Sequence, residues 1–187
     1  MLYLNNYKLY TDTFFRMVRN VSHLVVILMM CFVFVSCSRT TIYIVRHAEK
    51  DTVQKNNPPL TLAGLQRAHD LVTLLKNEPV HSVYSTNLIR TISTVQPTAD
   101  DHYITIALYD SIPQLMNFIS FRNKKDILIA GHSNTILDIA KALHTVPSKT
   151  EIADSDYDNL LIVSKDQFLF WKKTKLEETA YGPPTLP

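Results

Sequence analysis

Short apolar stretches alternate with helix-like stretches along most of this chain, and this alternation limits the possible folds more than any other feature. The strand-like stretches are residues 41–45, 80–84, 104–108 and 127–130. Between them, apolar residues recur at intervals of three and four, as they do on one face of a helix. Strands that alternate with helices predict a mostly parallel central sheet with helices on both faces, a three-layer α/β/α sandwich.

Several residues predict where these elements begin and end. Thr61 has the position and the side chain of a helix N-cap. A helix is expected over residues 87–96, because Pro97 disfavours a helical conformation of the residue before it. Residues 160–163 and 168–171 predict a closing hairpin. We therefore expect a folded domain over residues 41–176 and a loose tail over residues 177–187.

The first forty residues differ from the rest of the chain. Residues 24–35 are twelve consecutive apolar residues, too few to span a bilayer, which needs about 20. With Arg16 and Arg19 as a basic flank, they fit the apolar region of a signal peptide over residues 1–36. Met17 is a candidate for the true start, which would make this signal more compact.

The end of the apolar run, Phe34-Val35-Ser36-Cys37, resembles a bacterial lipobox, in which the cysteine becomes the lipidated first residue. The resemblance implies a lipidated N-terminus over residues 37–40 and a lipid anchor in a membrane of the bacterial cell envelope, outside the cytoplasm. An ordinary signal peptide with an incidental cysteine is the alternative.

Charge and cysteine content exclude several classes of function. The leader contains three of the 19 basic residues and one of the 17 acidic residues, so the rest of the chain has 16 of each. Such a balance gives no net basic field that would favour nucleic acid. The only cysteines are Cys31 and Cys37, so the expected mature domain has no disulfide and no cysteine-based metal site.

Charged and imidazole side chains stand at or shortly after the strand-like stretches. They are Arg46, His47, Arg90, Asp110 and His132. Because ligands of such sheets bind beyond the carboxyl ends of the strands, two imidazoles and two guanidiniums there predict an anion site. A guanidinium matches the geometry of phosphate oxygens, and a neutral imidazole can attack phosphorus. The pattern therefore favours phosphoryl chemistry on a histidine.

Four motifs follow one another along residues 41–163. They are Arg46-His47-Ala48, Leu60-Thr61-Leu62-Ala63-Gly64, Ser85-Thr86 with Arg90-Thr91, and Gly131-His132-Ser133-Asn134. In this order they resemble the histidine phosphatase superfamily, also called phosphoglycerate mutase-like. The chain differs from the family pattern at Ala48, where glycine is common, and at Val95, where alanine is usual.

The resemblance implies a phosphoglycerate mutase-like fold and a role for each matching residue. His47 would be the nucleophile that forms a phosphohistidine. Arg46, Arg90 and His132 would bind the phosphoryl oxygens, and His132 would also act in catalysis by stabilising charge in the transition state. Asp110 would protonate the leaving oxygen, with Glu49 as the alternative donor.

The implied activity is hydrolysis of a small phosphorylated substrate. Neither a metal nor another cofactor is expected, because two arginines and a protonated histidine would supply the positive charge. This chemistry requires a neutral His47, and His132 would act best if partly protonated. Two alternatives are a mutase, disfavoured by the roughly 40 residues between Arg90 and His132, and a non-catalytic phosphate-binding lipoprotein.

Overall fold

The structure is a computed structural model that describes residues 15–26, 38–120, 125–168 and 171–185. The chain divides into two units, Met1–Cys37 and Ser38–Pro187. In the first unit, residues 15–26 are helical and exposed. None of the described helices combines the length and the apolar composition needed to cross a membrane. Most of the predicted signal peptide, and the cysteine that follows it, Cys37, lie outside the described residues.

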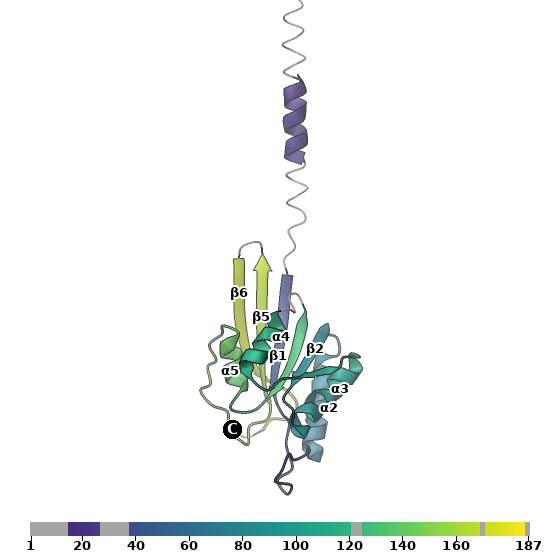
Figure 1. Cartoon of the computed structure of the whole chain (residues 1–187), viewed down its shortest axis with the longest axis vertical. Helices are drawn as coiled ribbons and strands as arrows, with labels where there is room; N and C mark the ends of the chain where they lie inside the picture. Colours follow the sequence, from purple (N-terminus) through teal and green to yellow (C-terminus); the bar gives the residue numbers. More distant parts are fainter. Residues whose placement is uncertain (1–14, 27–37, 121–124, 169–170, 186–187) are drawn as a thin grey trace, which may run out of the picture. The chain divides into compact units, whose positions relative to one another are not determined.

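The second unit contains a six-stranded sheet with the strand order β3-β2-β4-β1-β5-β6 (Figure 1). The strands are β1 (Ser38–Arg46), β2 (Val80–Ser85), β3 (Ile106–Leu108), β4 (Asp126–Gly131), β5 (Asn159–Phe168) and β6 (Trp171–Ala180). Strands β1 to β4 pair in parallel, whereas β5 pairs antiparallel with both β1 and β6. The predicted mostly parallel sheet is therefore confirmed.

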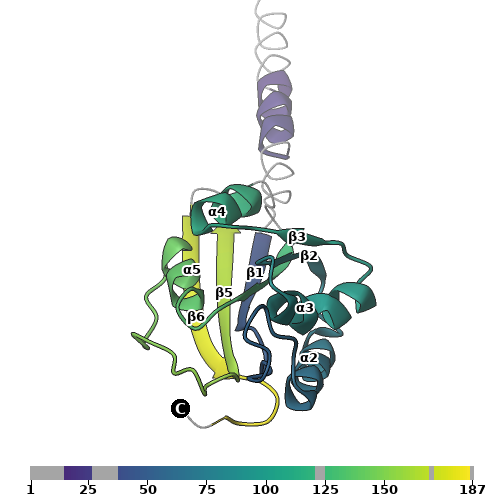
Figure 2. The same ribbon diagram turned by 60° about the horizontal axis from the view of Figure 1, so that its bottom comes forward.

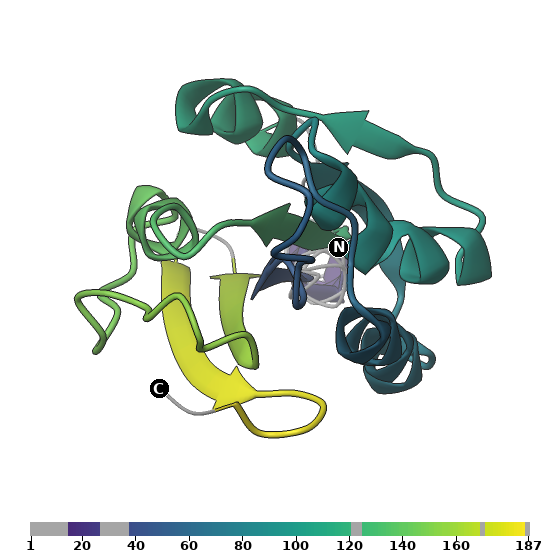
Figure 3. The same cartoon turned by 90° about the horizontal axis from the view of Figure 1, so that it is seen from below.

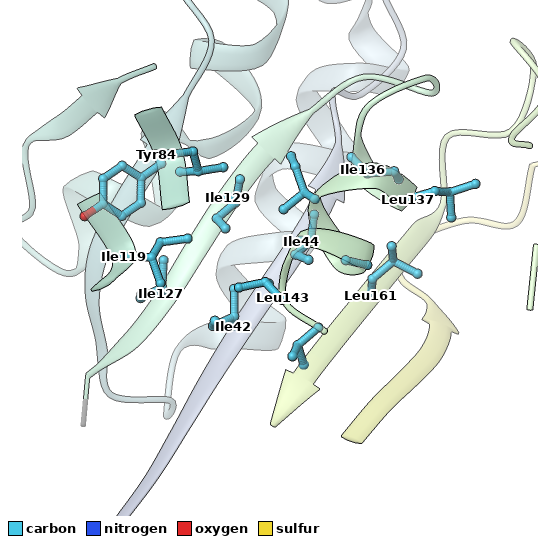
Figure 4. Close-up of a cluster of buried hydrophobic side chains, with 14 of the residues drawn as sticks. Ile42, Ile44, Tyr84, Ile119, Ile127, Ile129, Ile136, Leu137, Leu143 and Leu161 are labelled. Atoms are coloured by element: carbon cyan, nitrogen blue, oxygen red, sulfur yellow. The ribbon is translucent and has the colours of Figure 1, made fainter. Parts of the chain in front are cut away.

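Helices cover both faces of this sheet (Figures 2 and 3). They are α2 (Leu62–Leu75), α3 (Ile89–Asp101), α4 (Ile112–Ser120) and α5 (Ile136–Ala142). Along β1, side chains alternate between the faces: Ile42 and Ile44 pack in one core cluster with residues of α4 and α5, as Figure 4 shows for α5. Tyr43 and Val45 pack in the other cluster with residues of α2 and α3. This arrangement confirms the three-layer sandwich.

The start of α2 matches the sequence prediction. The Thr61 hydroxyl accepts a hydrogen bond from the Gly64 backbone N–H at 3.1 Å, as an N-cap does. A Cβ atom on Gly64 would lie 2.3 Å from the backbone oxygen of Glu49, so only glycine fits there. This close approach fixes α2 against the segment that follows the first strand.

The prediction that Pro97 ends the third helix is wrong. Helix α3 continues through Pro97 to Asp101. A proline removes only its own N–H from the hydrogen-bond ladder, and the residues after it still donate. Val95 and Ala99, on either side of the proline, are fully buried in the core between α3 and the sheet. Their burial stabilises the helix beyond the point where local preference would end it.

The second strand of the hairpin also differs from the prediction. Phe168 and Trp171, expected at the two ends of one strand, instead pair with each other where β5 and β6 meet. Strand β6 runs from Trp171 to Ala180. Its mostly exposed side chains give little of the apolar alternation by which a strand is found in a sequence.

Both predicted ends of the domain need correction. Strand β1 begins at Ser38, because Ser38 pairs with Gln167 of β5, so residues 38–40 belong to the sheet. The tail is also held in place up to residue 185. The Arg67 guanidinium donates to the backbone oxygen of Tyr181 at 2.7 Å and to the backbone oxygen of Pro183 at 2.8 Å. These bonds involve main-chain oxygens, which carry no sequence signal.

Candidate active site

The two histidines of the predicted site follow the ends of adjacent parallel strands. Arg46, the last residue of β1, pairs with Gly131, the last residue of β4. The next residues, His47 and His132, therefore leave the sheet side by side, and their ring centroids are 5.4 Å apart. The backbone N–H of His47 donates to the Gly131 oxygen at 2.9 Å, which extends the ladder into the site. Sheet register alone thus brings the two imidazoles together.

His47 is held in one tautomer. Its side chain is almost completely buried, and its Nδ1 lies 2.8 Å from the backbone oxygen of Ala48. Because a carbonyl oxygen only accepts, Nδ1 carries the proton and Nε2 keeps a free lone pair. Burial, followed by the nearby charges of Arg46, His132 and Arg90, lowers the pKa of His47 to about 3. The ring is therefore neutral at physiological pH, as an attacking imidazole must be.

His132 is held from two sides. Its Nε2 lies 3.0 Å from the Thr86 hydroxyl at the end of β2, and its backbone N–H donates to the Thr135 hydroxyl at 2.9 Å. Burial, and then the cations Arg90, Arg46 and Lys50, lower the pKa of His132 to about 4. The expected partial protonation is therefore not favoured at neutral pH in this structure, because the ring is buried beside fixed positive charges.

The two arginines differ in how their donors are used. The terminal nitrogens of Arg46 donate to the backbone oxygens of Ala153, Asp154 and Asp156 at 2.6–3.0 Å. Arg46 thus fixes the loop before β5. Its Nε and the Nε of Arg90, in the first turn of α3, are both buried and have no hydrogen-bond partner among the described residues. Buried donors are rarely left unpaired, so two of them beside the imidazoles indicate an anion site.

A threonine links the segment that follows His47 to the helix that carries Arg90. The Thr94 hydroxyl donates to the Arg90 backbone oxygen at 2.7 Å and accepts from the Ala48 N–H at 2.9 Å. Thr94 is completely buried, so this hydroxyl has no competing water. The position of Arg90 relative to His47 is therefore set by one side chain on the inner face of α3.

The two candidate proton donors have very different surroundings. Glu49 receives three hydrogen bonds from Arg67 at 2.7–3.1 Å. Burial opposes ionisation of Glu49, but the hydrogen bonds and charge of Arg67 outweigh it and hold the pKa of Glu49 below its ordinary value. A carboxylate held in this way is ionised at neutral pH and has no proton to donate. Its contacts are those of a structural ion pair.

Asp110 follows β3 at the carboxyl edge of the sheet, as predicted, and is exposed. Its backbone N–H donates to the Gln114 side chain at 2.7 Å. Within the described part of the chain, its carboxylate makes no hydrogen bond or ion pair with His47 or His132. Since β3 is three places from β1 in the sheet, the strand axes are roughly 14 Å apart. The role of Asp110 as proton donor stays a prediction.

Tyr157 is a neighbour of the site that sequence analysis missed. Its ring lies 4.3 Å from the guanidinium carbon of Arg46, and its centroid is 6.0 Å from that of His47. The residue comes from the loop between α5 and β5, which has no periodicity or motif that would mark it. Its place beside His47 depends on tertiary contacts of this loop, among them the hydrogen bonds from Arg46 and the bond from the Tyr157 backbone N–H to the Thr185 hydroxyl at 2.9 Å.

The depressed histidine pKa values predict acid sensitivity. Both rings have an ordinary pKa of 6.5 but titrate at about 3 and about 4 in the folded protein. Between these pH values the unfolded chain therefore binds more protons than the folded protein. The stability of the fold that depends on neutral rings is fully present above pH 6.5 and is lost as the pH falls toward 3. A His47→Asn/His132→Asn variant should lose less stability between pH 7 and pH 4, by an amount on the order of a few kcal/mol. Urea unfolding at both pH values measures this, and an identical loss in both proteins would contradict it.

Comparison with known proteins finds a family match for part of the chain. The sequence model of the histidine phosphatase superfamily (branch 1) matches residues 42–116, which include His47, Arg90 and Asp110. No curated protein matches the chain significantly.

Three solved structures show the same fold. Mycobacterial glucosyl-3-phosphoglycerate phosphatase has 12% identity and a TM-score of 0.57, covering 76% of this chain and 98% of its own. A protein assigned as phosphohistidine phosphatase SixA from Nakamurella multipartitia has 16% identity and a TM-score of 0.53, covering 78% and 96%. Phosphoserine phosphatase from Entamoeba histolytica has 16% identity and a TM-score of 0.50, covering 73% and 98%. The chain therefore has the phosphoglycerate mutase-like fold and is similar over residues 42–116 to the histidine phosphatase superfamily.

Proposed function

We propose that this protein is a histidine phosphatase that hydrolyses phosphate monoesters through a phosphohistidine on His47. One observation carries the proposal: a buried, neutral imidazole with a free Nε2 lies among groups that include two buried arginine N–H donors, which have no hydrogen-bond partner in the described part of the chain. The three structural neighbours described above are phosphatases by name and support the same class of reaction.

The chain's own residues account for each step. The lone pair of His47 Nε2 attacks phosphorus, an N–P bond forms, and the bond to the leaving oxygen breaks. Arg90, the remaining N–H of Arg46 and an N–H of His132 would stabilise the charge on the transferring phosphoryl oxygens. Asp110 gives its proton to the leaving oxygen. It then takes a proton from water as that water attacks phosphorus and releases His47.

Hydrolysis of p-nitrophenyl phosphate by the purified chain in EDTA tests the activity and its independence of metal. Turnover that EDTA does not reduce supports the proposal. Tight phosphate binding without turnover would instead favour a binding protein, and isomerisation of phosphoglycerate would favour a mutase.

Replacement of the two carboxylates should separate their roles. Asp110→Asn should lower kcat for alkyl phosphates by about 10²-fold or more, because their leaving oxygen needs a proton, and much less for p-nitrophenyl phosphate. Glu49→Gln should lower stability and affect both substrates alike, since Glu49 is paired with Arg67. Steady-state kinetics on the two substrates measure this difference. A leaving-group dependence that appears with Glu49→Gln instead would reverse the assignment.

We also propose that the protein is anchored in the bacterial cell envelope by a lipid on Cys37. The apolar run before this cysteine and its resemblance to a lipobox support the proposal. Metabolic labelling with an alkyne fatty acid should mark the wild-type chain, and Cys37→Ala should remove the label. Labelling that survives this substitution would refute the anchor.

A further inference from the structure

A second site lies at the other end of the sheet from the histidines. A cavity of about 530 Å³ opens at the amino end of β1, where Ser38 and Thr40 line it. His47 follows the carboxyl end of the same strand, roughly 30 Å away at the rise of an extended chain. A ligand in this cavity therefore cannot touch the phosphate site, and the cavity needs an explanation of its own.

The wall of the cavity combines an apolar part with a polar part. Met116 is the partly exposed apolar residue of the lining, and Ile119, Ile42 and Leu143 lie buried beside it. Figure 4 shows these last three side chains in the core cluster on one face of the sheet. Nearer the end of the sheet, Thr40 pairs with Lys165, and Gln167 pairs with Lys172. Paired residues share a face of a sheet, so both lysines lie on the face that carries Ile42. The cavity is thus amphipathic along the strand direction.

The charges on the polar part are mainly positive. Lys165 is half-buried, and within the described ranges its ammonium makes no hydrogen bond or ion pair. Lys172 and Lys173 line the same cavity, together with the imidazole of His144. Among the described residues of the lining, the one carboxylate is that of Asp166, which is paired with Arg39 at 2.8 Å.

A half-buried cation without a counter-ion is costly, and burial lowers the pKa of Lys165. An anionic ligand with an apolar part would remove that cost, because it would pair with the ammonium and cover the apolar wall. The chemistry of the cavity therefore favours an anionic amphiphile over a purely polar anion.

The position of the cavity in the chain indicates where such an amphiphile comes from. Ser38 lies at the edge of the cavity and directly follows Cys37. The twelve apolar residues 24–35 end two residues before Ser38 is reached, separated from it by Ser36 and Cys37. The end of β5 and the start of β6 lie at the same end of the sheet as the start of β1 (Figure 1). There Trp171, the only tryptophan of the chain, is 79% exposed. Exposed tryptophan next to lysine is typical of side chains at a membrane surface.

We propose that this cavity binds an anionic phospholipid, with the headgroup phosphate on Lys165 and Lys172 and the first part of an acyl chain against Met116 and Ile119. Bound in this way, the lipid orients the amino end of the sheet toward the membrane and leaves the histidines at the opposite end. The site is independent of the proposed phosphatase activity, since no residue is shared between the two.

Native mass spectrometry of the full chain in mild detergent tests the proposal with added phosphatidylglycerol, phosphatidylcholine or glycerol phosphate. We expect a retained phosphatidylglycerol adduct and much weaker adducts with the other two. Lys165→Gln/Lys172→Gln should reduce the phosphatidylglycerol adduct by about tenfold or more. Lys175→Gln, on the same strand but on the opposite face of the sheet, is the matched control and should retain it.

Each other outcome has a definite meaning. Equal adducts with both lipids, or an adduct that the double variant retains, would overturn the proposal. Retention of glycerol phosphate at the level of phosphatidylglycerol would make the ligand a soluble phosphate and refute the lipid. An unchanged melting temperature of the double variant shows that it is folded, and the measurement does not depend on turnover. Failure here therefore leaves the proposed phosphatase activity untouched.

Discussion

Replacement of His47 by alanine is expected to abolish phosphate-monoester hydrolysis, with a loss in kcat of more than about a thousandfold. In the proposed mechanism the variant removes the one group that would form a bond to phosphorus, whereas Arg90 and His132 would remain to bind phosphate. Inorganic phosphate should therefore still bind, and the loss should appear in kcat more than in KM. Turnover of p-nitrophenyl phosphate and calorimetric titration with phosphate measure the two effects.

His69 provides the matched control, because it is an exposed histidine on the outer side of α2. His69→Ala should retain full activity. With a radiolabelled substrate, rapid quenching should trap an acid-labile, alkali-stable label on the wild-type chain and none on His47→Ala. A His47→Ala protein that is folded and still turns over substrate at the wild-type rate would end the assignment of His47 as nucleophile.

Replacement of Arg67 by methionine is expected to cost about 3–5 kcal/mol in the free energy of unfolding. Arg67 is 1% exposed, and its guanidinium contacts Glu49, Tyr181 and Pro183. Without it, Glu49 is a partly buried charge with no partner, and two backbone oxygens of the tail lose their donor. Chemical denaturation of the full chain measures the loss.

Two further variants show whether this loss comes from the network. In the Arg67→Met/Glu49→Gln protein, the unpaired charge is gone, so part of the lost stability should return. Arg39→Met disrupts an ion pair between exposed side chains, where pairs contribute about 0–1 kcal/mol, and should change stability little. Equal losses in the free energy of unfolding for Arg67→Met and Arg39→Met would show that the buried network stabilises the fold no more than an exposed ion pair does.

Activity should also fall in Arg67→Met, although Arg67 touches neither histidine. Glu49 is two residues from His47, and its backbone oxygen receives the Thr61 N–H at the start of α2. The network of Arg67 thus holds the segment that fixes the His47 ring. We expect a lower kcat with little change in KM, because the loss is in positioning and not in substrate binding.

Much of the fold could be predicted because its signals are local. Apolar alternation and the N-cap at Thr61 depend on residues close in sequence, and they gave the layers and the start of α2 correctly. Pro97 misled the prediction because a local preference was outweighed by burial of its neighbours in the core. Strand β6 was misplaced because an exposed edge strand has weak apolar patterning.

The sequence by itself determined which groups follow the ends of strands, and therefore that His47 and His132 lie at the same edge of the sheet. Strand order and register decided that these rings lie 5.4 Å apart. Only the tertiary structure decided that Arg46 donates hydrogen bonds to a loop more than 100 residues away in the sequence. It also decided that Tyr157 lies against Arg46. Contacts to backbone oxygens leave no mark on residue identity, since every residue has such an oxygen, and they become visible only when the chain is folded.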